Sequence, residues 1–210
     1  MSAAYSWELI CPHTSSPNLL GEISEFRGRT LYANGRRPRF ARNGGFADDD
    51  PIDLHSFHVT VRSDGYLIGC VRVTPIGELS QSFVGRLAET LPVKAALQAL
   101  RVEASECAEA GRWIVAPSAR GACLGRNLLV STWVVGRWLN KRCLFGAIGV
   151  RDGQVKMCAR CGGQTAPATA PVFVEEYDDE LSLMYFDLPN PPAGVAAQLD
   201  RVERVLGLRI

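Results

Sequence analysis

The sequence predicts a mixed α/β (α+β) fold in which helices flank a central sheet, within one domain spanning residues 1–210. Three observations carry this prediction. Residues 53–75 contain two β-rich runs around an Asp-Gly pair, which is typical of a hairpin turn. Residues 109–150 alternate strand, helix and strand, a pattern that favours one sheet with helices packed on it. The final segment, residues 192–208, spaces its apolar residues at helical intervals.

The other elements follow from periodicity and from capping residues. Ser16 can cap a first helix that has Pro17 at its first position, and Gly35 ends that helix. Residues 36–51 are rich in Gly, Pro and charge and predict a long loop, a kind of segment that is often functional. The patterns further predict helices over 80–91 and 93–106, a strand over 109–116, a helix over 124–139, a strand over 143–150, a short helix over 153–161 and a hairpin made of 172–176 and 181–188.

Composition narrows the class of protein. The chain is 47% hydrophobic and 21% charged, with a net charge of +1, so we expect no broad nucleic-acid footprint. No window of about 20 apolar residues predicts a membrane span. The N-terminus lacks a basic segment followed by an apolar run, so we expect no secretory signal. Seven cysteines, an odd number, favour a reducing cytoplasm over a disulfide framework.

A single CxxC pair, Cys158 and Cys161, is the one pattern that could suggest a metal. Zinc needs further ligands at suitable spacing, and the three histidines lie far away in the sequence. The surrounding letters, VKMCARCGG, are typical of a helix end with a glycine cap. We therefore expect no metal site and no metal cofactor.

The most informative stretch is residues 112–129, which leaves an apolar strand, passes through small residues and enters a helix. Backbone N–H groups at such a helix start favour phosphate. Arg120 and Arg126 can add charge-assisted hydrogen bonds. By spacing alone, an anion-binding loop and an ordinary connection with two solvated arginines explain the stretch equally well.

The same stretch resembles the acyl-thioester-binding motif of the GNAT acyltransferase superfamily, a strand followed by Arg/Gln-x-x-Gly-x-Gly/Ala and a helix. Arg120 fills its first position and Gly125 its last, whereas Cys123 stands where a glycine is usual. The resemblance implies a GNAT-like fold with a twisted mixed sheet, and an acyl-CoA or acyl-ACP donor bound through its phosphopantetheine. The donor-binding residues that it implies are Ile114, Val115, Arg120, Gly121, Ala122, Cys123, Leu124, Gly125 and Arg126.

A second set of residues resembles the acyl-homoserine-lactone (autoinducer) synthases and the long-chain N-acyl amino acid synthases. Those families carry ordered acidic and basic positions, which here correspond to Asp50, Asp53, Arg72, Glu109 and Arg112, with an upstream arginine at 27 or 29. Their usual tryptophan is absent. The resemblance implies catalytic roles for Glu109, Arg112 and Arg72, and acceptor binding by Arg29, Asp50 and Asp53. Arg72 and Arg112 lie in apolar strands, and buried charges need partners, which favours an ionic network.

Together these resemblances imply an N-acyltransferase that moves an acyl group from acyl-CoA or acyl-ACP to the amine of a small amino-acid-like acceptor. Glu109 is the implied base, and backbone N–H groups near residues 113–115 are implied to stabilise the oxyanion. Implied partners are a small-molecule amine and an acyl carrier protein, in the cytoplasm. Two alternatives remain open: an acetyl-CoA-dependent N-acetyltransferase of a small amine, and a non-catalytic GNAT-fold binding module.

Overall fold

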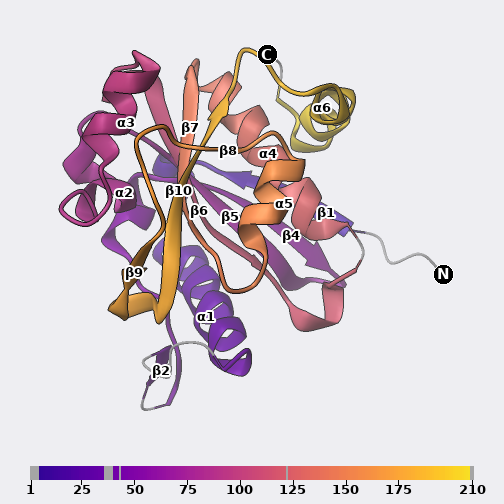
Figure 1. The fold of residues 1–210 in the computed structure, drawn as a ribbon. Helices are drawn as coiled ribbons and strands as arrows, with labels where there is room; N and C mark the ends of the chain where they lie inside the picture. The colour runs from indigo at the N-terminus through magenta and orange to yellow at the C-terminus, as the bar shows by residue number, and fades with distance from the viewer. Residues whose placement is uncertain (1–4, 36–39, 43, 122, 209–210) are drawn as a thin grey trace.

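One twisted sheet organises the protein (Figure 1). The computed structural model describes residues 5–35, 40–42, 44–121 and 123–208. Within them the strands are arranged in the order β1-β4-β5-β6-β7-β10-β8, and β9 pairs with β10. Their bounds are β1 Tyr5–Ile10, β4 Phe57–Ser63, β5 Tyr66–Pro75, β6 Cys107–Val115, β7 Cys143–Gly149, β8 Gln164–Thr165, β9 Val172–Val174 and β10 Asp179–Asp187.

Helices cover both faces of this sheet. The α-helices are α1 Pro17–Ala33, α2 Phe83–Arg86, α3 Val93–Leu100, α4 Leu124–Trp138, α5 Gln154–Arg160 and α6 Ala193–Leu206. Side chains of α4 and α6 share one core with Val71 and Val73 of β5. Residues of α1 contact Cys70 on the opposite face, and α2 and α3 pack against Phe145 of β7. Figure 1 shows α2 and α3 on the left of the sheet and α4 and α6 on the right.

Alternation along the strands decides which side chains meet. Successive residues of a strand point to opposite faces. Val71 and Val73 therefore lie under α4, whereas Arg72 between them points to the face that carries α1, α2 and α3. The same argument places Glu109 of β6 on that face, because its neighbours Ala108 and Ala110 belong to the α4 core. A charged face thus lies back to back with an apolar one.

The predicted mixed α/β class is confirmed. The first helix, both hairpins, the strands at β6 and β7 and the helices α4, α5 and α6 appear close to their predicted bounds. The segments 80–91 and 93–106 are less helical than predicted: α2 has four residues, α3 has eight, and short 3-10 turns fill part of the remainder. The edge strand β1 and the short strand β8 were not predicted.

The predicted long loop has structure of its own. Ala41–Arg42 (β2) and Gly45–Phe46 (β3) form a small antiparallel ladder beside α1. The chain then crosses α1 at Gly28, where an added Cβ would lie 2.7 Å from the backbone nitrogen of Ala47. No helix within the described ranges is long and apolar enough to span a membrane.

Replacing Gly28 with alanine tests this crossing. We expect Gly28→Ala to destabilise the fold by about 1–3 kcal/mol, because the added methyl group meets backbone that must shift. Gly21→Ala in the same helix meets nothing within 4 Å. It should stabilise the protein by about 0.5–1 kcal/mol through helix propensity. Urea denaturation of both variants checks the pair, and equal effects would contradict the close crossing.

Candidate functional site

A bulge in β6 shapes the site. Opposite β6, Cys70 pairs with Ile114 and Arg72 pairs with Gly111, so two β6 residues, Arg112 and Trp113, stand opposite the single residue Val71. Arg112 has a φ of 53°, in the left-handed region that a non-glycine residue seldom adopts. Bulges re-aim side chains beside functional sites. Here the bulge lies at the start of the segment that the sequence predicts to supply the oxyanion contact.

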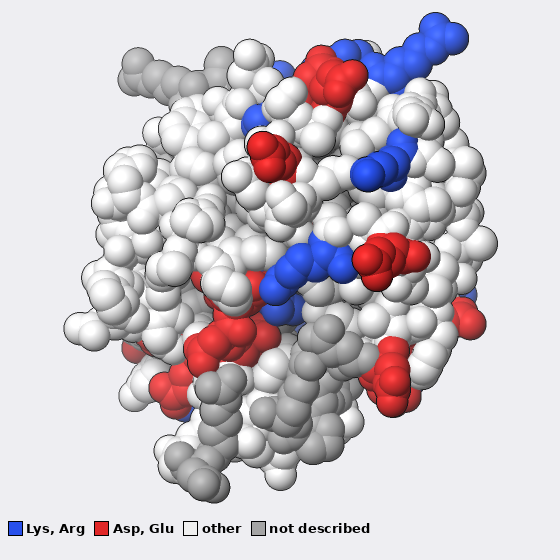
Figure 2. Space-filling view, turned by 90° about the vertical axis from the view of Figure 1, so that its left-hand side faces the viewer, with Lys and Arg blue, Asp and Glu red and all other residues white. Residues whose placement is uncertain are grey.

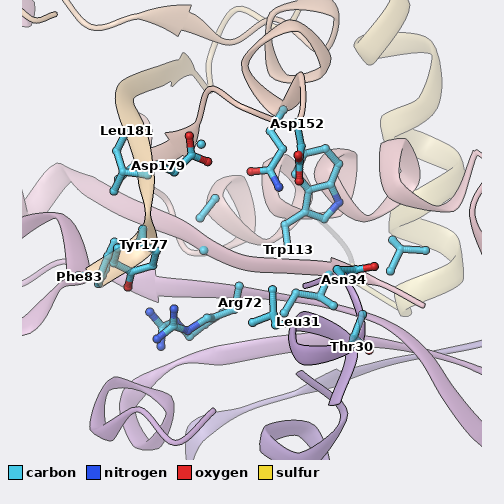
Figure 3. A pocket seen from close by; sticks show the side chains of 18 of the residues that line it. Thr30, Leu31, Asn34, Arg72, Phe83, Trp113, Asp152, Tyr177, Asp179 and Leu181 are labelled. Carbon is cyan, nitrogen blue, oxygen red and sulfur yellow. The ribbon is translucent and has the colours of Figure 1, made fainter. Parts of the chain in front are cut away.

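The neighbouring strand parts from β6 at the same level. The parallel pairing of β6 with β7 covers only Cys107 to Glu109 against Cys143 to Phe145. Beyond that point β6 and β7 line a cavity of about 680 Å³. Figure 3 shows Trp113 of β6 near its centre, with Arg72, Phe83 and Tyr177 at one end and Asn34 and Thr30 at another.

One end of this cavity rests on a buried charge cluster, defined as Arg27, Asp48, Asp50, Asp53, Arg72, Arg86, Glu109 and Arg112. Arg72 is at its centre and is 1% exposed. Its Nη1 donates to Asp50 and Asp53, at 2.9 Å each, and its Nη2 lies 3.5 Å from Glu109 Oε1. Removing any member leaves a partner charged in a dry interior, so the cluster is held as a unit.

The cluster ties three distant segments together. Arg27 of α1 pairs with Asp53 and, at 3.2 Å, with Asp48. Arg112 of β6 reaches Asp48 at 3.1 Å and Asp50 at 3.0 Å. Three of the four acidic residues, Asp48, Asp50 and Asp53, belong to the segment that follows β3, so the arginines fasten that segment over the sheet. Burial opposes ionisation of Asp50, yet the guanidinium groups of Arg72 and Arg112 hold its pKa well below its usual range.

Glu109 differs from the other carboxylates of the cluster. It is 1% exposed, and burial raises its pKa even though Arg72 and the Val84 N–H favour its charged form. Oε2 accepts the Val84 N–H at 2.8 Å, which fixes the carboxylate from α2. Glu109 also lines the cavity. A carboxylate with a raised pKa in a cavity wall has the properties of a general base.

Aromatic side chains cover the guanidinium of Arg112. Its Cζ lies 5.7 Å from the centre of the Phe83 ring, and Phe83 meets Tyr177 edge-on with ring centres 5.3 Å apart. Cation–π contact of this kind favours the charged form of arginine. On the face in Figure 2, acidic and basic side chains lie beside one another and neither sign forms an extended patch. The arrangement suits a small charged ligand better than a polyanion.

The predicted charged residues lie together in the charge cluster, with the exception of Arg29. Arg72, Asp50, Asp53, Glu109 and Arg112 all belong to the cluster. Arg29, the predicted acceptor-binding arginine, does not: its side chain is 61% exposed and pairs with Glu25 one turn away. Arg27 belongs to the cluster instead, because residues 27 and 29 point to different sides of α1 and only Arg27 faces the sheet. The sequence left both arginines open and gave no reason to choose Arg29.

The predicted donor-binding residues are divided by the structure. Ile114, Val115 and Arg120 line the cavity. Leu124 is buried in the α4 core. Arg126 points elsewhere, with its Nη2 3.4 Å from the Gly194 carbonyl. Ala122 lies outside the described residues.

The glycine positions of the predicted loop differ from one another. Gly121 has a φ of 90°, which needs glycine. Cys123 has a φ of 56° at the residue before α4, so the residue that departs from the motif sits where glycine would be relaxed. Gly125 lies against Trp113, whose Nε1 donates to the Gly125 carbonyl at 2.9 Å. This bond ties the first turn of α4 to the bulge of β6.

Several site residues escaped prediction. Asp48 pairs with Arg27 and Arg112. The run of three aspartates at 48–50 is the sequence feature that could have indicated it. Arg86 and Phe83 come from a segment without a recognisable motif. The CxxC cysteines, Cys158 and Cys161, are buried in the α4 core around the end of α5.

Known structures share this fold. TofI, in a ternary complex with an inhibitor and MTA, aligns with a TM-score of 0.67 at 17% identity, over 93% of this chain and 96% of that chain. BjaI, a CoA-dependent acyl-homoserine lactone synthase with SAM and isopentyl-CoA, aligns with a TM-score of 0.68 at 15% identity, over 99% and 92%. FeeM, an N-acyl amino acid synthase from uncultured soil microbes, aligns with a TM-score of 0.64 at 11% identity, over 90% and 93%.

The predicted resemblance to these synthases is therefore confirmed at the level of the GNAT-like fold. No protein-family model and no curated protein matches the sequence. Identities this low carry the fold and not the substrates, so the activity has to be argued from the cavity itself.

Exchanging Arg27 and Arg29 for methionine tests the corrected assignment. Arg27→Met should lower the free energy of unfolding by about 3–5 kcal/mol, because Asp48 and Asp53 would be left buried beside fewer cations. Arg29→Met removes only an exposed pair and should stay within about 0.5 kcal/mol of the parent. Chemical denaturation measures both. Similar losses in the two variants would contradict the assignment.

Buried His58 predicts a pH dependence of stability. Its Nε2 lies 3.2 Å from the Asp53 carbonyl oxygen, and burial lowers its pKa to about 4. A depressed folded-state pKa stabilises the fold above the unfolded value near 6.5 and loses that stability as pH falls toward 4. Unfolding free energy should drop by about 2 kcal/mol between about pH 7 and pH 5.

A His58→Gln variant should lack most of this pH slope, whereas His13→Gln, at an exposed position, should keep it. Denaturation midpoints at the two pH values give the comparison. A slope that survives in His58→Gln would show that another group is responsible.

Proposed function

We propose that the protein is an N-acyltransferase that moves an acyl group from a phosphopantetheine thioester, acyl-CoA or acyl-ACP, to the amine of a small amino-acid-like acceptor. The observation that carries the proposal is the gap between β6 and β7 beyond Glu109 and Phe145. Backbone groups on the facing strand edges are not paired with each other there. An extended donor arm with amide groups can satisfy such edges in the way that an added strand does.

The mouth of the cavity fits the anionic part of such a donor. Arg120 lines the cavity, and its Nη2 donates to Asn34 Oδ1 at 2.9 Å. The connection that carries Arg120 leads into the N-terminus of α4, where backbone N–H groups and the helix dipole favour phosphate. The donor supplies the activated acyl group, and the protein supplies the groups that orient it.

Proton transfer is assigned to Glu109. An acceptor amine must lose a proton as it attacks the thioester carbon, and a carboxylate in the cavity wall can take that proton directly or through water. Arg72 favours the charged form of Glu109, and the Val84 N–H holds the orientation of the carboxylate. We assign stabilisation of the developing oxyanion to backbone N–H groups of the bulged segment after Arg112, whose residues line the cavity.

A short acyl group is the second candidate within this function. The point where β6 and β7 join is filled by Phe145 and Leu183, which are 1% and 0% exposed. Hydrocarbon can extend past this point only by displacing packed core side chains. This packing favours a donor of acetyl size over a long-chain one.

Acyl transfer and its dependence on Glu109 can be tested together. Wild-type protein is incubated with CoA thioesters of graded length and a panel of amino acids and amines, with released thiol and acylated product measured by mass spectrometry. Glu109→Gln should lower turnover about 100- to 10,000-fold, the usual contribution of a general base. Turnover of the wild type should rise as the pH passes the raised pKa of Glu109, because the base form appears above it. The Glu109→Gln variant should lack this rise.

The matched control is Glu106→Gln, which removes a half-buried carboxylate three residues away that pairs with Arg142. It should leave turnover unchanged. Denaturation should show Glu109→Gln folded, since an amide oxygen can still accept the Val84 N–H. Full activity in Glu109→Gln, or transfer by the wild type from no donor, would overturn the assignment.

A further inference from the structure

The cavity has walls of opposite charge. Arg72, Arg112 and Arg120 contribute guanidinium groups to its lining, and Asp152 and Asp179 contribute carboxylates. Figure 3 shows Arg72 below Trp113 and the two aspartates above it. The charge cluster explains the position of Arg72 and Arg112, but it includes neither Asp152 nor Asp179. The acidic wall thus comes from elements outside the charge cluster.

Asp179 is placed there by a glycine. It begins β10 and is 5% exposed, and its Oδ1 accepts the Arg151 N–H at 3.1 Å. A Cβ on Gly149 would lie 2.5 Å from Asp179 Oδ2 and 3.5 Å from Gln154 Oε1. Asp179 Oδ2 and Gln154 Oε1 therefore both lie close to Gly149, which leaves room for them because it has no side chain. All three residues line the cavity.

The acceptor oxygens near Gly149 favour a cationic ligand group over hydrocarbon. Hydrocarbon placed against Asp179 would offer no hydrogen bond to the carboxylate and would exclude water from it. An ammonium group would instead make charge-assisted hydrogen bonds to Asp179 and Gln154. Leu181 and Ala147, which also line the cavity, can cover the carbon atoms next to such a group.

An independent observation lies at the opposite wall. The Nε of Arg72 is buried and has no hydrogen-bond partner in the described part of the chain. It faces the space that a side chain at Gly111 would fill, 3.9 Å from the position of that Cβ, and Glu109 Oε1 borders the same space at 3.3 Å. A ligand oxygen near Gly111 would give the unpaired donor of Arg72 a partner. One wall of the cavity therefore offers a hydrogen-bond donor to a ligand oxygen, and the other wall offers acceptor oxygens to a cation.

We propose that the acceptor is a basic amino acid, whose side-chain ammonium binds Asp179 and Gln154 over Gly149 while its carboxylate faces Arg72. The proposal rests on the proposed function, which supplies the acceptor amine, and adds the substrate class. The α-amine then lies between the two walls, on the side of Glu109. Asp152, at the exposed end of the acidic wall, favours entry of the cationic group.

Lysine and norleucine form the test pair, because they differ only in the side-chain ammonium. With the donor that the wild type uses, lysine should have a kcat/KM about 10- to 100-fold above norleucine, the range expected for hydrogen bonds to a charged group. Asp179→Asn, which keeps an acceptor for the Arg151 N–H, should reduce that ratio to near one and leave the KM of the donor unchanged.

Asp178→Asn is the matched control. It removes the neighbouring carboxylate, which pairs with Arg151 and does not line the cavity, so the lysine preference should persist. Gln154→Leu supplies a second variant if Asp179→Asn folds poorly, and it should weaken the preference as well. Equal use of lysine and norleucine by the wild type, or a preference that survives both variants, would overturn the proposal.

Binding separates this proposal from the proposed function. Calorimetric titration of lysine and norleucine into wild-type protein with CoA present gives the affinity ratio without turnover. Tighter binding of lysine that is lost in Asp179→Asn supports the subsite even if no acyl transfer occurs. Acyl transfer to norleucine with no affinity difference would keep the proposed function and reject the subsite.

Discussion

The contact of Arg72 with three carboxylates is the constraint on which the site depends. Asp50, Asp53 and Glu109 surround a guanidinium that is 1% exposed, and their charges compensate its burial in the sheet. That requirement fixes the segment after β3 over β5 and β6, and it sets the electrostatic environment of Glu109. Arg72 therefore orders the segment and favours the charged form of Glu109, whereas burial raises the pKa of that carboxylate. The apolar core under α4 could be repacked without altering either of them.

Much of the fold could be predicted because its signals are local. The hairpin of β4 and β5, the helix α4 and the amphipathic helix α6 each carry their periodicity and caps within a few residues. The failures are tertiary in origin. The edge strand β1 is defined by pairing with β4, more than forty-five residues away, and only Ile10 of β1 is buried. The short helices between β5 and β6 lie over Phe145, and this packing, not helix propensity, sets their lengths.

The candidate site was predictable in its residue types and less so in its arrangement. Charges inside apolar strands, at Arg72 and Arg112, indicate partners wherever they occur, and the aspartate run indicated where those partners lie. Choosing between Arg27 and Arg29 required the rotation of α1 about its axis, which two arginines separated by one residue leave undetermined. The acidic wall was invisible for another reason: Asp179 reaches the cavity only because Gly149, thirty residues earlier, has no side chain.

The brief parallel contact between β6 and β7 has a mechanical consequence. Three residue pairs join the two halves of the sheet, and side chains of α4 also bridge the halves on one face. Leu128 of α4 lies against Gly69 of β5, while Trp133 meets Phe186 of β10 with ring centres 5.7 Å apart. The helix acts as a spacer whose side-chain volumes set the width of the opening. Substitutions in α4 are then expected to change the width of the cavity from the far face of the sheet.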